Sequence, residues 1–320
     1  MSTAKLLGLE VVKAGVLALL QDAGRFGYEH LGLSTGGPID SNAFALANNL
    51  CGNSSGCTSI EIAVGGLALR AQLHTTVAVT GAVMPVHING KPKAQWCSHL
   101  LVPGDLLELG YARRGCRGYV AVAGGFQVRP QFGSTATVLR EHIGGLNGGA
   151  LVSGDLLPCE ASAPQLSRQL PIYAQPQYPK ALTLRLVLGY QHLGFDDDQL
   201  QRFFTSEYRV SALCDRMAYR LEGPAVVASL RGMVSEGNCL GAVQLPPDGQ
   251  PMVLLNDRQS IGGYPKMGSV LAADCARLGQ LSSGDSVRFS IISQFDAVAI
   301  AMAQLSQAAS EAITEHGYTP

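Results

Sequence analysis

Short apolar runs, each with Gly, Pro or Asp close by, recur along the whole 320-residue chain. Several alternate apolar and polar positions or are rich in β-branched residues. Such runs between turn residues are typical of β-strands. The sequence therefore predicts a mainly β fold with many short strands. The runs are "TTVAVTGAV", "LLELG", "GYVAVAGGF", "LTLRLVLG", "GAVQL", "PMVLL" and "SVRFSII".

A few segments carry helix signals instead. In "PIDSNAFALANNLCGN", Asp40 or Ser41 can act as the N-cap, and Gly52 can end the helix. The acidic start of "FDDDQLQRFFTSEY" suits a helix N-terminus, and "LAADCARLGQL" predicts a third, short helix. Apolar residues spaced three or four apart predict an amphipathic C-terminal helix from Gln294 to about His316.

One turn design occurs three times, in "PGDLLELG" (103–110), "SGDLLPCE" (153–160) and "SGDSVRFS" (283–290). In each, Gly-Asp precedes a strand-like run, as turn chemistry requires. Its recurrence near the end of both halves suggests two related β-units. The Pro-rich, polar segment 161–180 marks the boundary between them. We predict an N-terminal β-rich domain (1–165), a linker (166–180) and a C-terminal β-rich domain with its terminal helix (181–320).

Charge and composition narrow the class of partner. The chain has 23 basic and 24 acidic residues and no basic run, which argues against nucleic acid or an electrostatic membrane anchor as partner. No segment has the roughly 20 apolar residues of a membrane span. We expect no export signal, because the apolar stretch 16–20 is short and Gln21-Asp22 follows it. Eight scattered cysteines form no CxxC pair. We expect a cytoplasmic protein with reduced thiols and no bound metal.

The familiar catalytic signatures are missing or incomplete. "GLSTG" (32–36) matches the serine nucleophile elbow, but a strand does not precede it and a helix does not follow directly. A Gly-Pro turn is the better interpretation. The sequence contains no P-loop, no G-x-G-x-x-G after a strand and no H-E-x-x-H, and its histidines have no convergent spacing.

What remains are polar residues clustered beside glycines. "LQDAGRFGYEHLG", "CDRMAYRLEG" and "GAVQLPPDGQPMVLLNDRQSIGGYPKMGS" carry amides, carboxylates and guanidinium groups at high density for a weakly charged protein. They indicate a binding surface for a polar ligand. The alternative is that the charged residues stabilise turns and that "PPDG" is a plain hairpin turn.

These stretches also carry a family resemblance. Together with "SIEIAVGGLALR", "VAVTGA", "GYVAVAGGF" and "FGSTATVLREHIGGLNGGALVSGDLL", they resemble the biotin-dependent carboxyltransferase family, also called allophanate hydrolase subunit 2 or KipA-like. The matches appear in order over roughly 9–289. The family includes the C subunit of bacterial 5-oxoprolinase.

The resemblance implies two cyclophilin-like β-barrel units and a multi-subunit enzyme that opens 5-oxoproline to glutamate with ATP hydrolysis. The partners would be a B subunit, similar to allophanate hydrolase subunit 1, and a LamB/YcsF-like A subunit, with ATP bound by the complex. Two alternatives stay open: biotin-dependent carboxyl transfer to urea or another amide, with biotin on a separate carrier, and a KipA-like regulatory binding protein.

Under this resemblance, we assign roles to the clustered residues as a hypothesis. Three carboxylates are candidates for acid/base or orienting groups: Asp22, Asp248 and Asp257. The candidates for substrate binding, among which Arg216 and Arg220 could hold a carboxylate or phosphate, are Arg25, Arg216, Tyr219, Arg220, Gln244, Gln250, Gln259 and Tyr264.

Overall fold

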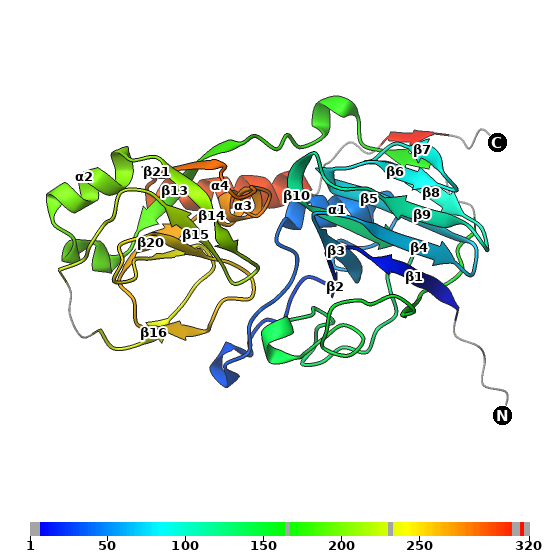
Figure 1. Cartoon of the computed structure of the whole chain (residues 1–320), viewed down its shortest axis with the longest axis horizontal. Coiled ribbons are helices and arrows are strands. Elements are labelled where there is room, and N and C mark those ends of the chain that lie inside the picture. The colour runs from blue at the N-terminus through cyan, green and yellow to red at the C-terminus, as the bar shows by residue number, and fades with distance from the viewer. Residues whose placement is uncertain (1–6, 164–166, 230–232, 309–313, 317–320) are drawn as a thin grey trace. The chain divides into compact units, whose positions relative to one another are not determined.

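The computed structural model describes residues 7–163, 167–229, 233–308 and 314–316. The chain divides into two compact units (Figure 1). We call them the N-terminal unit, made of Met1–Arg25, Gly36–Gln177 and Ala312–Pro320, and the barrel unit, made of Phe26–Thr35 and Tyr178–Glu311. Phe26–Thr35 thus belongs to the barrel unit, although residues of the N-terminal unit flank it in sequence.

Two antiparallel sheets form the body of the N-terminal unit. The six-stranded sheet has the order β11 (Leu156–Pro158), β1 (Gly8–Ala14), β4 (Leu67–Ala71), β9 (Leu106–Leu109), β6 (Val86–Ile88) and β7 (Lys91–Lys93). The five-stranded sheet has the order β2 (Leu17–Gln21), β3 (Ser59–Ala63), β10 (Arg114–Val122), β5 (Thr75–Val83) and β8 (Ser98–Leu101). Helix α1 (Ser41–Leu50) and the 3-10 turns η2 (Leu139–Glu141) and η3 (Ile172–Ala174) complete the unit.

The barrel unit is built on a closed seven-stranded barrel. Its order is β13 (Ala181–Leu188), β20 (Lys266–Val270), β17 (Ala242–Gln244), β18 (Met252–Leu254), β15 (Ala218–Glu222), β14 (Tyr208–Cys214) and β21 (Ser286–Ile291). A parallel β13–β21 pair closes it. Around it lie α2 (Asp197–Thr205), α3 (Ala272–Leu278), α4 (Gln294–Ala308), the two-stranded β16 (Glu236–Gly237) and β19 (Ile261–Gly262), and the turns η1 (Glu29–Leu31) and η4 (Tyr190–Gly194).

The mainly β prediction is confirmed, and the predicted strand runs fall on the observed strands. All three Gly-Asp segments adopt one turn. The glycines have positive φ angles of 96°, 93° and 89° at Gly104, Gly154 and Gly284. Each aspartate accepts a hydrogen bond from the backbone N–H three residues earlier, at 2.9, 2.8 and 2.9 Å for Asp105, Asp155 and Asp285. The carboxylate satisfies a backbone donor before the chain enters β9, β11 or β21, which explains the repeat.

The two sheets of the N-terminal unit pack face to face over an apolar core. Leu9 and Leu69 from one sheet and Val79 and Val120 from the other belong to the same buried cluster. The second face of the five-stranded sheet is covered by α1, which contacts β5 and β10. Strands β3 and β5 and the second half of β10 are therefore buried on both faces, including polar residues among them such as Glu61 and Thr80.

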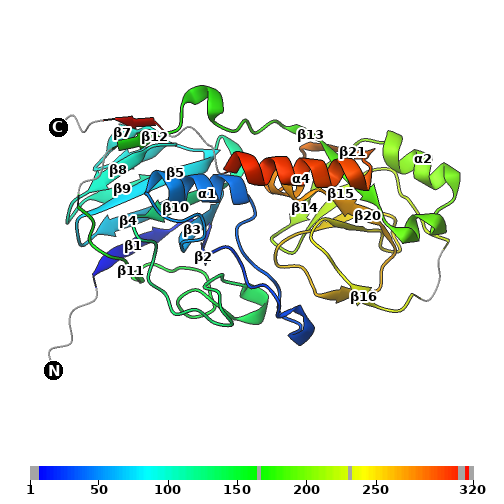
Figure 2. The same cartoon turned by 180° about the vertical axis from the view of Figure 1, so that it is seen from behind.

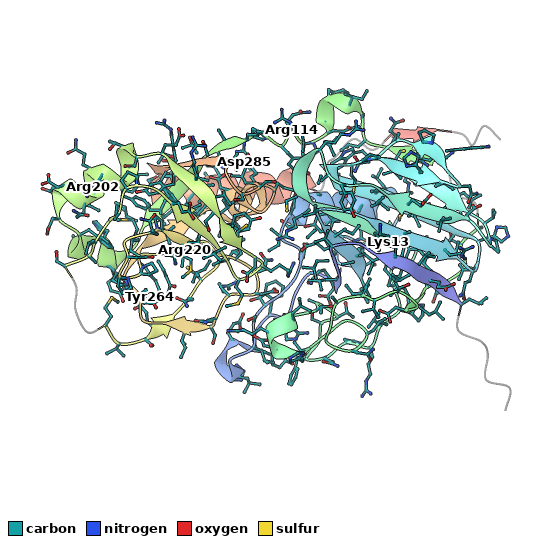
Figure 3. The ribbon with its side chains drawn as sticks, viewed as in Figure 1. Lys13, Arg114, Arg202, Arg220, Tyr264 and Asp285 are labelled. Carbon is teal, nitrogen blue, oxygen red and sulfur yellow. The ribbon has the colours of Figure 1, made fainter. Side chains whose placement is uncertain are left out.

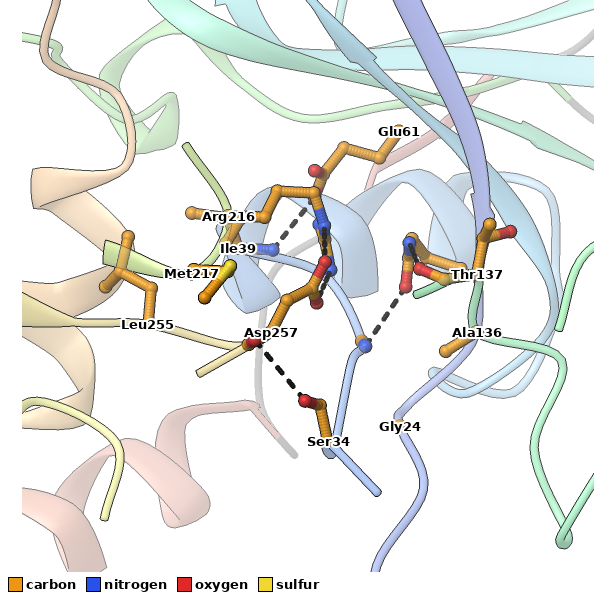
Figure 4. Close-up of polar contacts among 12 residues, drawn as sticks. Gly24, Ser34, Ile39, Glu61, Ala136, Thr137, Arg216, Met217, Leu255 and Asp257 are labelled. Atoms are coloured by element: carbon orange, nitrogen blue, oxygen red, sulfur yellow. Dashed lines mark hydrogen bonds and ion pairs between the residues drawn. The ribbon is translucent and has the colours of Figure 1, made fainter. Parts of the chain in front are cut away.

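A buried carboxylate organises the entry into α1. Glu61 lies in the middle of β3, where its Oε2 accepts hydrogen bonds from the Tyr119 hydroxyl and the Ile39 backbone N–H, both at 2.8 Å (Figure 4 shows the bond from Ile39). The Tyr119 oxygen accepts in turn from the Asp40 N–H at 2.8 Å. Asp40 is the N-cap of α1, accepting from Ala43 N at 3.1 Å. Burial raises the pKa of Tyr119 well above its ordinary value, so the phenol remains a donor.

Three of the predicted helices are confirmed, and the fourth extends less far than predicted. Helix α4 begins at Gln294 and its range ends at Ala308, whereas Thr314–His316 is strand β22. This strand pairs antiparallel with β12 (Ser167–Gln169). A partner strand about 150 residues away satisfies its backbone groups, and helical spacing cannot reveal such a contact. Helix α4 lies to one side of the barrel strands, behind them in Figure 1 and in front of them in Figure 2.

Replacing Tyr119 with Phe tests the buried network around Glu61. The variant removes the phenolic oxygen and leaves its buried partners short of one hydrogen bond each, so we expect a loss of about 1–3 kcal/mol in the free energy of unfolding. Chemical denaturation followed by circular dichroism measures it. Tyr111→Phe is the control because the Tyr111 side chain is largely exposed. Equal midpoints for the two variants would contradict this role.

Candidate ligand-binding pocket in the barrel unit

A pocket of about 220 Å³ lies in the barrel unit. Its volume is below the usual range of sites for drug-sized ligands, so it suits a small molecule. Strands β15, β17 and β18 supply one part of its wall, and the segments around β16 and β19 supply the other. The lining residues are Met217, Ala218, Asn238, Gln244, Met252, Leu254, Arg258, Gln259, Gly262, Gly263 and Tyr264.

Two primary amides in this wall are joined in a short network. Gln244 Nε2 donates to Asn238 Oδ1 at 3.2 Å, and Asn238 Nδ2 donates to the backbone oxygen of Gln259 at 3.2 Å. Each amide carries two N–H donors and one carbonyl acceptor, and these bonds use only some of them. Because Met252 and Leu254 lie in the same lining, the pocket combines hydrogen-bonding groups with an apolar surface.

Arg258 is the cation among the described lining residues. Its Nε donates to the backbone oxygen of Asn238 at 3.1 Å and its Nη1 to that of Leu255 at 3.3 Å. In the part of the chain that the structure describes, no carboxylate lies within ion-pair distance of it. Glu29 acts on it only through longer-range attraction. Burial lowers the pKa of Arg258 from its ordinary value, but a guanidinium still remains charged.

A buried ion pair fixes the backbone that carries Arg258. Arg216 donates from Nε and Nη2 to the two carboxylate oxygens of Asp257, at 2.9 and 2.8 Å, and both side chains are about 95% buried (Figure 4). The Asp257 N–H returns a 2.9 Å bond to the Arg216 carbonyl. The Ser34 hydroxyl donates to the Arg258 carbonyl at 2.9 Å. Bidentate pairing restricts orientation as well as distance, so this segment is held firmly.

A second ion pair holds the opposite wall. The Lys266 ammonium donates to Glu236 Oε1 at 2.8 Å and to the Gly237 carbonyl at 3.0 Å. Gln191 Nε2 donates to the same carboxylate oxygen. The Lys266 contact is the main cause of a lowered pKa at Glu236. These bonds tie β16, which directly precedes Asn238, to strand β20 of the barrel.

Among the residues assigned a role from the sequence, Gln244, Gln259 and Tyr264 line the pocket. Arg216 and Asp257 lie next to lining residues in sequence and bond to one another. The other barrel-unit candidates contact groups outside the lining. The Tyr219 hydroxyl donates to the carbonyls of Gly279 and Leu281, Arg220 pairs with Asp248, and Gln250 bonds to the Gly223 backbone in both directions. Figure 3 shows Arg220 and Tyr264 on the barrel unit.

Asp22 and Arg25 belong to the N-terminal unit and both hold the loop 131–136. Asp22 accepts from the Ser134 hydroxyl at 2.6 Å and the Thr135 N–H at 2.7 Å. Arg25 donates to carbonyls of the same loop, at 3.1 Å for Gln131 and Ala136. These contacts match the alternative in which the charged residues stabilise turns. The catalytic and binding roles assigned from the sequence stay predictions.

Sequence reasoning does not single out Arg258 or Asn238. Arg258 is one of several charged residues in its stretch, and the feature that distinguishes it is the lack of a carboxylate partner among the described residues, which only the fold reveals. Asn238 enters the lining because β16 pairs with β19 through Gly237 and Ile261. Two-residue strands leave no periodic signal in a sequence.

The possibilities for other chemistry are limited in the described residues. They contain no group of three or more His, Cys, Asp or Glu side chains placed to hold a metal ion. All eight cysteines are free. Ser34 donates its hydroxyl to the backbone carbonyls of Asp257 and Arg258. Within the described ranges, no helix combines the length and apolar character needed to cross a membrane.

The chain belongs to the family described as "Carboxyltransferase domain, subdomain A and B", whose model matches residues 31–291. It is 34% identical to the 5-oxoprolinase C subunit of Escherichia coli K12 over 88% of this chain and 90% of that protein. TTHA0988, whose crystal structure is known, is 36% identical in sequence to this chain, and the two structures match with a TM-score of 0.81. The match covers 91% of this chain and 57% of that one. The Kluyveromyces lactis urea carboxylase is 26% identical, with a TM-score of 0.89 over the whole of this chain and 31% of that one.

Gly262 offers a test of the amide network. A Cβ atom there would lie 2.7 Å from Gln244 Nε2 and 2.8 Å from Asn238 Nδ2, whereas one at Gly237, which neighbours it across the β16–β19 pair, would meet nothing within 4 Å. We expect Gly262→Ala to displace both side-chain amides and to shift their ¹H–¹⁵N NMR signals. The control Gly237→Ala leaves them in place. Unshifted amide signals in Gly262→Ala would refute this arrangement of the pocket.

Proposed function

We propose that this chain is the C subunit of an ATP-dependent 5-oxoprolinase complex, which opens 5-oxo-L-proline to L-glutamate. The observation that carries the proposal is the match to the 5-oxoprolinase C subunit of Escherichia coli, which spans about nine tenths of both chains. The proposed partners are an allophanate hydrolase subunit 1-like B subunit and a LamB/YcsF-like A subunit. The proposed location is the cytoplasm.

The chemistry of a lactam explains why such a reaction needs ATP. Amide resonance makes the carbonyl carbon a poor electrophile. Transfer of the γ-phosphoryl group to the lactam oxygen, with ADP as leaving group, activates it. Water then attacks the ring carbon and the C–N bond breaks as the nitrogen takes a proton, which leaves the acyl phosphate of glutamate. A second water hydrolyses this acyl phosphate to glutamate and inorganic phosphate. Such a sequence relies on positioning and charge stabilisation rather than on a protein nucleophile.

In this proposal the barrel pocket holds the lactam. The amides of Gln244 and Asn238 can exchange hydrogen bonds with the ring N–H and carbonyl, and Met252 and Leu254 offer apolar contact for the ring methylenes. The pocket is small, and its only cation among the described lining residues is Arg258. These features, with the absence of a P-loop in the sequence, favour an ATP site elsewhere in the complex.

A second candidate is carboxyl transfer to urea or another small amide. Its support is the 0.89 TM-score against the urea carboxylase. In this alternative the biotin is carried by a separate polypeptide, because the sequence contains no biotinylation segment of the A/M-K-M type. The third candidate, a KipA-like regulatory binding protein, would show neither 5-oxoproline hydrolysis nor carboxyl transfer.

Reconstitution of the three proposed subunits separates these functions. The complex is expected to release glutamate from 5-oxo-L-proline with matching ATP hydrolysis, and Gln244→Ala should lower kcat/KM about 5- to 30-fold, because a lost hydrogen bond to the substrate costs about 1–2 kcal/mol. Gln201→Ala, on the exposed face of α2, is the control. Carboxylation of urea by a biotinylated partner, without glutamate release, would replace this function by the second.

A further inference from the structure

We propose that Arg258 is the anion-binding group of the barrel pocket, and that the pocket takes a small molecule in which a carboxylate is attached to a compact amide. The inference rests on the proposed function only for its choice of 5-oxo-L-proline as probe. It replaces Arg216 and Arg220, which the sequence suggested for this task, by a residue that lines the pocket itself.

Arg258 differs from Arg216 and Arg220 in its bonding partners. Arg216 is bidentate to Asp257, and Arg220 pairs with Asp248, so each of these cations already has a carboxylate. Arg258 bonds only to two backbone carbonyls among the described residues, through Nε and Nη1, and Nη2 has no protein partner there. A partly buried charge without a counter-charge is costly. A bound carboxylate would remove that cost.

The groups around the guanidinium do not supply this counter-charge. Glu29 attracts it at long range, and Cys239 and Cys275 are free cysteines. Burial raises the pKa of Cys275 far above neutrality, so its thiol stays uncharged. The Lys266 ammonium on the other wall is neutralised by Glu236. Among the described lining residues, Arg258 therefore presents the one unneutralised positive charge, which fits a monoanion.

The ligand class follows from what shares the pocket with Arg258. The primary amides of Gln244 and Asn238 can donate to a carbonyl and accept from an N–H, which is the pattern of an amide or lactam. Neutral urea would satisfy these groups but leave the guanidinium uncompensated. The pocket should thus distinguish a carboxylate-bearing lactam from a neutral one, and from urea.

The Arg258 guanidinium is also ordered before a carboxylate binds. Its backbone is fixed by the Arg216–Asp257 pair and by Ser34, and its Nε and Nη1 are fixed by carbonyls. A group already ordered loses little side-chain entropy when a ligand binds. Charge-assisted hydrogen bonds contribute about 1.5–3 kcal/mol, which corresponds to about 10- to 150-fold in affinity.

The test compares two probes on the purified chain by isothermal titration calorimetry or ligand-observed NMR. The probes are 5-oxo-L-proline, an anion at about pH 7.5, and 2-pyrrolidinone, the same lactam ring without the carboxylate. We expect wild-type protein to bind 5-oxo-L-proline at least tenfold more tightly. Arg258→Gln should bring the two Kd values to within about threefold by weakening only the anion. Arg209→Gln, which removes an exposed cation of the barrel unit outside the lining, should leave the ratio unchanged.

The ratio of the two Kd values distinguishes carboxylate binding by Arg258 from a general structural role, because a damaged pocket would bind both probes more weakly. An unchanged ratio in Arg258→Gln, equal weakening of both probes, or wild-type protein that binds them equally or not at all would overturn the proposal. If Arg258→Gln does not fold, Arg258→Lys takes its place and must give an intermediate ratio. Glutamate release by the reconstituted complex is scored separately: its absence with the ratio intact defeats the proposed function alone.

Discussion

The bidentate ion pair between Arg216 and Asp257 is the interaction on which the candidate site depends. Isolated buried charges are strongly unfavourable, so each of these groups requires the other. Their pairing joins the turn that precedes β15 to the segment that follows β18. Arg258 and Gln259 come next along that segment and line the pocket. The pair therefore places pocket residues without occupying the pocket, and its own charges are neutralised by one another.

A second ion pair holds another part of the pocket wall in the same way. Lys266 and Glu236 fasten the short β16 segment to the barrel, and Asn238 follows β16 directly. Among the described residues, Arg216 and Lys266 lie beside this site, and each has a carboxylate partner. What remains for a ligand is the guanidinium of Arg258 and the amides of Gln244 and Asn238. This combination of groups suits the binding of a small polar molecule, in keeping with the proposed role as one subunit of a complex.

Much of the fold could be predicted from the sequence because its signals are local. β-branched runs, the Asp40 cap and the Gly-Asp turns depend on neighbours a few residues away. The end of the terminal helix could not be predicted, because β22 is defined by its pairing with distant β12. In the site, Gln244, Gln259 and Tyr264 were selected by their polar character. Arg258 and Asn238 were missed because a missing ion-pair partner and a two-residue strand pairing are properties of the folded chain.

A crystal structure of the protein with 5-oxo-L-proline is the most direct test that the barrel pocket is the ligand site. The account predicts the carboxylate within hydrogen-bonding distance of the Arg258 guanidinium, with the lactam against Gln244 and Asn238. A ligand bound elsewhere, or bound in the pocket with its carboxylate directed away from Arg258, would contradict it.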